Sequence, residues 1–190
     1  MKSKLLTLSI VLSCAFAGNA MSMTKVEYKT EKDRISGDYK VAKDKCSSLK
    51  ANAKDICISE AKGTEKVAKA EMESKYKPSA RGAEKVGMAK ADAMYDTAKE
   101  KCDDLSGNAK DVCVKDAKVA FTKAKDDAKI AKVSADTSAD KSSKMADVKK
   151  DASDDERKAM FKAANERCDA LAGAPKDACQ ADAKVKFGMK

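Results

Sequence analysis

The chain contains three copies of one cysteine-bearing segment, and this repeat constrains its fold more than any other feature. The copies read DKCSSLKANAKDICISEAK, EKCDDLSGNAKDVCVKDAK and ERCDALAGAPKDACQADAK. In each copy, ten residues separate two cysteines. A repeat of this kind indicates one structural unit used three times. The cysteine pairs are Cys46 and Cys57, Cys102 and Cys113, and Cys168 and Cys179.

Each copy is predicted to fold as a helix, a tight bend and a second helix. In the middle copy, apolar and small residues recur at steps of three and four from Met88 through Tyr95 and Cys102 to Leu105, which places them on one helix face. Gly107 can end that helix in the left-handed conformation. The predicted fold is therefore all-α, with three antiparallel helical hairpins.

The residues after each bend suit the start of a new helix. Asn52 and Asn108 are expected to be N-caps in the first two copies. In the third copy, Pro175 is suited to the first helical position.

This bend explains the cysteine spacing. In a straight helix, eleven residues would separate the two sulfur atoms by about 16 Å. Folding the chain back at the bend lets the two Cα atoms approach to about 6 Å, as a disulfide requires. We therefore expect three disulfides, each within one copy. The spacing fits neither a zinc site nor a C-x-x-C redox pair.

The N-terminal residues predict export. A basic MKSK start, the apolar run LLTLSIVL and small residues up to Ala20 are typical of a signal peptide over residues 1–20, cleaved after Ala17 or Ala20. A lipoprotein signal acylated at Cys14 is the alternative. Cleavage after either alanine leaves six cysteines, an even number that fits disulfides in an oxidising compartment such as the periplasm. The sequence contains no second apolar run after the signal peptide, so we expect no transmembrane segment in the mature chain.

The hairpins are expected at 21–76, 83–133 and 153–190, with a polar linker over 134–152. The first two hairpins are expected to pack as an elongated four-helix bundle or coiled coil. Ser153 and Glu156 have the spacing of a capping box, which would start the third hairpin as a semi-independent unit.

Composition excludes several classes of site. The chain has no histidine, so imidazole catalysis and histidine metal ligation are excluded. We expect no catalytic, cofactor or metal site. Neighbouring aspartates at 103–104 and 154–155 are interpreted as helix-capping and solubilising groups. The aromatic residues beside the cysteine stripe are expected to pack in the helix seams: Tyr39, Tyr95, Phe121, Phe161 and Phe187.

Charge suggests one kind of partner. The formal net charge is +9, or +7 without the two lysines of the predicted signal peptide. This excess would attract polyanions such as anionic envelope polymers. The basic residues are not interleaved with aromatic residues, so sequence-specific nucleic-acid binding is not expected.

The motif C-D-x-L-x-G-N-A-K-D-x-C, together with EKVAKAE and SKYKPS, resembles small exported Ala/Lys-rich proteins of Gram-negative bacteria. These proteins are often labelled TolA-like or cell-envelope proteins. The resemblance implies a periplasmic helical protein and supplies no catalytic residues.

Three functions follow as hypotheses. The first is a non-enzymatic structural or interaction protein of the cell envelope, whose partner is an envelope protein or an anionic envelope polymer. The second is a stress-responsive periplasmic chaperone whose methionines hold unfolded chains. The third is a polyanion-binding basic protein. The methionines considered for the chaperone are Met23, Met72, Met88, Met94 and Met160.

Overall fold

The computed structural model describes residues 23–190, and within them the chain forms α-helices without any β-strand. This confirms the all-α prediction. The predicted signal peptide, its cleavage sites and Cys14 lie outside the described residues. The helices are α1 (Lys25–Lys45), α2 (Ala51–Tyr76), α3 (Ala80–Cys102), α4 (Gly107–Ser134), α5 (Lys141–Cys168) and α6 (Ala174–Phe187), with a short 3₁₀ turn, η1 (Cys46–Ser48), after α1.

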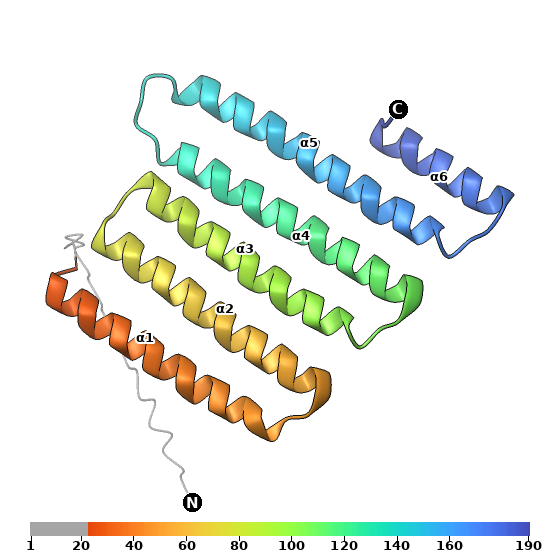
Figure 1. The fold of residues 1–190 in the computed structure, drawn as a ribbon. Coiled ribbons are helices and arrows are strands. Elements are labelled where there is room, and N and C mark those ends of the chain that lie inside the picture. Colours follow the sequence, from red (N-terminus) through yellow and green to blue (C-terminus); the bar gives the residue numbers. More distant parts are fainter. Residues whose placement is uncertain (1–22) are drawn as a thin grey trace, which may run out of the picture.

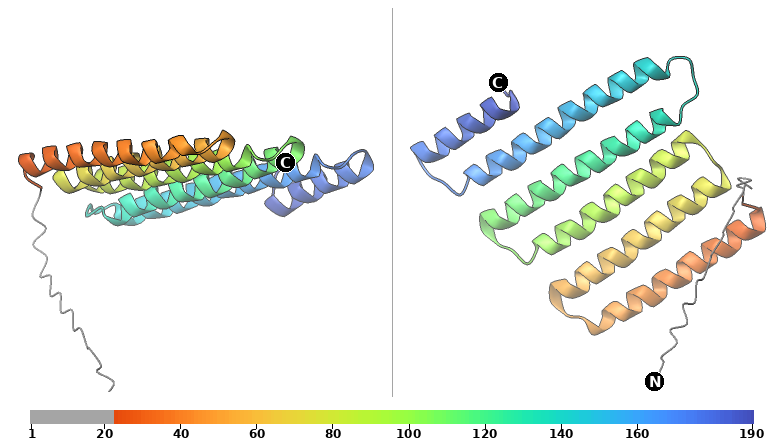
Figure 2. Two further views of the ribbon diagram at one scale, coloured as in Figure 1. Left: turned by 90° about the horizontal axis from the view of Figure 1, so that it is seen from below. Right: turned by 180° about the vertical axis from the view of Figure 1, so that it is seen from behind.

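The six helices lie side by side in chain order and form one open layer (Figures 1 and 2). Over residues 23–190, each helix packs only against the helices that precede and follow it in the chain. The first two hairpins do pack together, through α2 and α3. They do not close into a four-helix bundle, because α1 makes no contact with α4.

The layer is held together by small side chains. Its buried apolar residues are mostly alanines, together with the first cysteine of each copy. Gly87 on α3 lies so close to α4 that a Cβ atom there would stand 2.5 Å from the Cβ of Ala128. Gly63 on α2 meets Ala93 on α3 in the same way, at 2.8 Å. Because small residues let helix backbones approach, alanine-rich faces can pack on both sides of one helix.

Each hairpin is stapled beside its bend, as predicted. The disulfides join Cys46 to Cys57, Cys102 to Cys113 and Cys168 to Cys179, with Cα separations of 5.6, 5.7 and 5.7 Å. All three stapled bends lie along the same edge of the layer (Figure 1).

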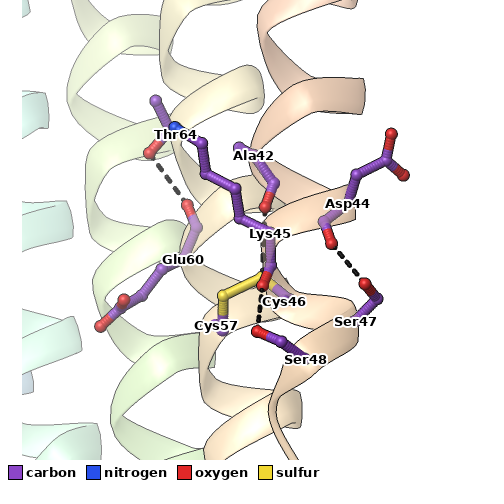
Figure 3. The surroundings of a disulfide bond; sticks show 9 residues. All are labelled: Ala42, Asp44, Lys45, Cys46, Ser47, Ser48, Cys57, Glu60 and Thr64. Atoms are coloured by element: carbon purple, nitrogen blue, oxygen red, sulfur yellow. Dashed lines mark hydrogen bonds between the residues drawn. A yellow bond between two sulfur atoms is a disulfide. The ribbon is translucent and has the colours of Figure 1, made fainter.

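The first stapled bend shows how the chain turns (Figure 3). Ser47 and Ser48 donate hydrogen bonds from their hydroxyl groups to the carbonyls of Asp44 and Lys45, so the end of α1 is capped locally. The backbone N–H of Leu49 then donates to the carbonyl of Cys46.

A left-handed residue follows at the same position in each bend. Gly107 and Gly173 have φ values of +56° and +59°, and Ala51 has +48° in the first copy. The prediction of a left-handed glycine at 107 is therefore right in conformation. However, α3 already ends at Cys102, and Gly107 begins α4.

The predicted asparagine caps are wrong, because both asparagines bind the neighbouring repeat. The N-cap residues are Lys50 and Ser106, and Asn52 and Asn108 lie within the first turns. The Nδ2 of Asn52 donates to the backbone carbonyl of Glu100 at 2.7 Å.

The second copy repeats this contact. The Nδ2 of Asn108 donates to the backbone carbonyl of Glu166 at 2.9 Å. Each asparagine thus caps the end of the helix that enters the next bend. The third copy has Ala174 at this position.

An ion pair also repeats between the copies. Lys101 lies 3.4 Å from Glu60, and Arg167 lies 2.5 Å from Asp116 at the equivalent positions. These contacts join α2 to α3 and α4 to α5 in the same register. Equivalent ion pairs therefore join successive hairpins at both of their junctions.

The third hairpin begins earlier than predicted. Helix α5 starts at Lys141, so only residues 135–140 form the connection that was expected over 134–152. Ser153 and Glu156 lie inside α5 and form no capping box. The expectation of a semi-independent unit is also wrong, because α5 packs against α4 along the layer and buries Ala152.

Candidate functional site

A groove of about 500 Å³ lies over α4 and is the candidate functional site. Tyr95 of α3 and a series of α4 and α5 residues line it. Its position follows from the open layer, because α4 has α3 on one side and α5 on the other. Its charged and aromatic lining residues are Tyr95, Lys115, Lys118, Phe121, Lys125, Asp126, Lys129, Asp155, Lys158 and Lys162.

Helical spacing brings the α4 residues to the groove. Val114, Lys118, Phe121 and Lys125 follow one another at steps of four, three and four, which puts them on one face of the helix.

An aromatic pair joins α3 to α4 at the groove. The rings of Tyr95 and Phe121 stack with centroids 4.7 Å apart and an interplanar angle of 25°. The Nζ of Lys118 lies 4.4 Å from the centroid of Phe121, and that of Lys125 lies 5.2 Å away. These cation–π contacts hold two ammonium groups beside the rings.

Lysines dominate the charge of the groove, because six line it against two aspartates. Three of the six are neutralised by carboxylates: Lys115 by Glu166, Lys129 by Asp126 and Lys158 by Asp155. Among residues 23–190, no carboxylate lies within ion-pair distance of Lys118, Lys125 or Lys162. The groove therefore offers three uncompensated ammonium groups to an anion.

Asp126 is the buried polar residue of the groove, with only 1% of its surface exposed. Its Oδ1 accepts a hydrogen bond from Lys129 at 2.7 Å. Its Oδ2 is buried and has no hydrogen-bond partner in the described part of the chain. The bond to Asp126 raises the pKa of Lys129, so this lysine stays charged.

The residues that the sequence analysis singled out lie in different parts of the layer. The six cysteines form the predicted staples, away from the groove. Tyr95 and Phe121 do lie in a helix seam, but at its half-exposed edge. Of the paired aspartates, Asp103 contacts Lys110 at 3.0 Å and Asp154 contacts Arg157 at 2.7 Å.

The methionines considered for the chaperone differ in their exposure. Met72 is buried, with 4% exposure, whereas Met94 and Met160 are 49% and 41% exposed on α3 and α5. Met94 and Met160 also line different pockets.

Sequence reasoning missed the groove, although one signal was available. Tyr95 lies seven residues before Cys102, and Phe121 lies eight residues after Cys113. Once a disulfide pairs these cysteines, nearly equal distances along the two helices place the rings opposite each other. The burial of Asp126 could not be predicted in this way. Asp126 and Asp127 are the same residue type side by side in the sequence, yet only Asp126 is buried.

The described residues also lack two other kinds of feature. Between 23 and 190, no group of three or more histidine, cysteine, aspartate or glutamate side chains is placed to hold a metal ion. In the same range, every helix is too short or too polar to cross a membrane.

Comparisons with protein-family models, with curated proteins and with solved structures find no match to this chain.

Proposed function

We propose that the protein is a non-enzymatic interaction protein of the cell envelope that holds an anionic partner in the groove over α4. Three disulfides favour an oxidising compartment outside the cytoplasm. Together with the predicted signal peptide, they support a location in the periplasm. The stapled layer is then a scaffold that holds the groove open.

One observation carries the proposal: Lys118, Lys125 and Lys162 line the groove without carboxylate partners in the described part of the chain. Most lysines on a helix surface interact weakly with nearby acids or are simply solvated. Here two of the three lie against stacked rings, which fixes their position before a ligand arrives. Fixed charges of one sign in a concave site attract an oppositely charged ligand more strongly than scattered ones.

The proposal predicts salt-dependent binding of a polyanion through these three lysines. Inorganic polyphosphate serves as the probe, and binding is measured by calorimetry at several salt concentrations. Changing Lys118, Lys125 and Lys162 together to glutamine should weaken binding at least tenfold. It should also reduce the slope of log K against log salt concentration by about 2, because fewer counterions are released.

The control changes the same number of charges elsewhere. Lys29, Lys32 and Lys40 are exposed on α1, and their triple glutamine variant has the same net charge as the groove variant. Its affinity should stay close to that of the unmodified protein. Equal losses in both variants would show that only overall charge matters, and absence of polyphosphate binding would overturn the proposal.

A further inference from the structure

Asp126 has a free acceptor that the fold does not explain. A carboxylate can accept about four hydrogen bonds, and Asp126 accepts one, from Lys129. Its second oxygen is buried without a partner within residues 23–190. A buried acceptor left unpaired costs stability, so an apolar side chain at this position would serve packing better.

The surroundings of Asp126 restrict what can bind that oxygen. The group must donate a hydrogen bond, since an ionised carboxylate only accepts. Three of the six lysines that line this groove have no carboxylate partner among residues 23–190, and their charge disfavours a cationic donor. A phosphate or sulfate group that is fully ionised has no proton to donate. The remaining choice is a neutral donor, such as a hydroxyl group, on a ligand that also carries acids for the lysines.

We propose that the groove binds an acidic saccharide, whose carboxylate or phosphate groups meet Lys118, Lys125 and Lys162 and whose hydroxyl group donates to Asp126. This inference rests on the proposed function and specifies its ligand. An acidic saccharide carries many hydroxyl groups, which can donate hydrogen bonds, and negatively charged groups on the same chain. Asp126 and the three free lysines line the same groove.

Single-stranded RNA also carries hydroxyl groups and phosphates, but the groove suits it less. Recognition of unpaired bases relies on open aromatic faces for stacking. Phe121 stacks on Tyr95, and the Lys118 ammonium lies 4.4 Å from its centroid. The ring faces are therefore engaged by the protein itself.

The test compares two probes and two variants. Oligogalacturonate carries carboxylates and hydroxyl groups, whereas inorganic polyphosphate carries charge without hydroxyl donors along its chain. Asp126→Asn removes the buried acceptor charge. Asp127→Asn is the matched control, because Asp127 follows on the same helix, is exposed and pairs with Lys123.

The expected result is a split between the two probes. Asp126→Asn should weaken oligogalacturonate binding about tenfold, because a lost hydrogen bond to a charged group costs about that factor. The same variant should bind polyphosphate equally or more tightly, because a negative charge has left the groove. Asp127→Asn should bind both probes as the unmodified protein does or slightly more tightly.

A measurement on the unmodified protein keeps the test independent of folding. Oligogalacturonate with acetylated hydroxyl groups retains its carboxylates and should bind about tenfold more weakly than the free form. Equal affinity for both forms, or parallel changes for both probes in Asp126→Asn, would overturn the saccharide assignment while leaving anion binding intact. Tighter binding of an RNA oligomer than of oligogalacturonate would overturn it as well. Failure of both oligogalacturonate and polyphosphate to bind would instead overturn the proposed function, and the saccharide assignment with it.

Discussion

Replacing Cys102 and Cys113 together with serine should lower the free energy of unfolding by about 3 kcal/mol, because the disulfide closes a loop of about a dozen residues. This loss is large for a layer whose buried apolar residues are mostly alanine. Alanine removes little apolar surface from water, so the hairpins depend more on their staples than larger cores do. Urea unfolding followed by circular dichroism measures the change.

The matched control is the pair Cys168 and Cys179, changed to serine in the same way. This staple holds only α6, a helix of 14 residues at the edge of the layer, against α5. Its loss should expose the amides of α6 to hydrogen exchange and leave α1–α4 protected. In contrast, loss of the middle staple should reduce protection in α3 and α4. Equal unfolding free energies for the middle-staple variant and the unmodified protein would contradict the proposed role of the staples.

Changing Gly87 to alanine should destabilise the protein by about 1–3 kcal/mol. The new Cβ would stand 2.5 Å from the Cβ of Ala128 and 3.2 Å from its Cα, so α3 and α4 would have to separate. Alanine favours helix over glycine by about 1 kcal/mol, and the clash must exceed this gain. The measurement is the midpoint of urea unfolding.

Gly37→Ala is the opposite case within the same protein. Gly37 lies inside α1, and a Cβ there would meet no atom of residues 23–190 within 4 Å. The same chemical change should therefore stabilise the protein by about 0.5–1 kcal/mol. If both glycine variants were stabilised alike, α3 and α4 would not be in the close contact described above.

The three staples could be predicted because each pairing depends on local sequence. Two cysteines at a fixed spacing around a bend can pair in one geometry, and this geometry does not depend on how the hairpins pack together. The arrangement of the hairpins relative to one another could not be predicted in this way. Alanine-rich helices have small residues on several faces, so their periodicity does not say whether two hairpins close into a bundle or extend as a layer.

Contacts between helices determine the extent of α5 and the roles of the two asparagines, which were predicted wrongly from sequence. Residues 141–152 are polar and read as a linker, yet they form a helix in which Ala152 is buried against its neighbours. Asn52 and Asn108 have the character of N-caps, but the adjacent repeat supplies a backbone carbonyl for each. The groove depends on the side-by-side placement of α3, α4 and α5, which no local pattern specifies.

The distance between α1 and α4 tests the open layer most directly. Spin labels can be attached through a non-natural keto amino acid at the exposed positions Asp33 and Lys123, which leaves the cysteines unchanged. The layer places three helix-to-helix steps between them, so pulsed electron paramagnetic resonance should give a distance of about 25–30 Å. A distance of about 10 Å would mean that the first two hairpins close into a four-helix bundle, and it would contradict the layer and the groove built on it.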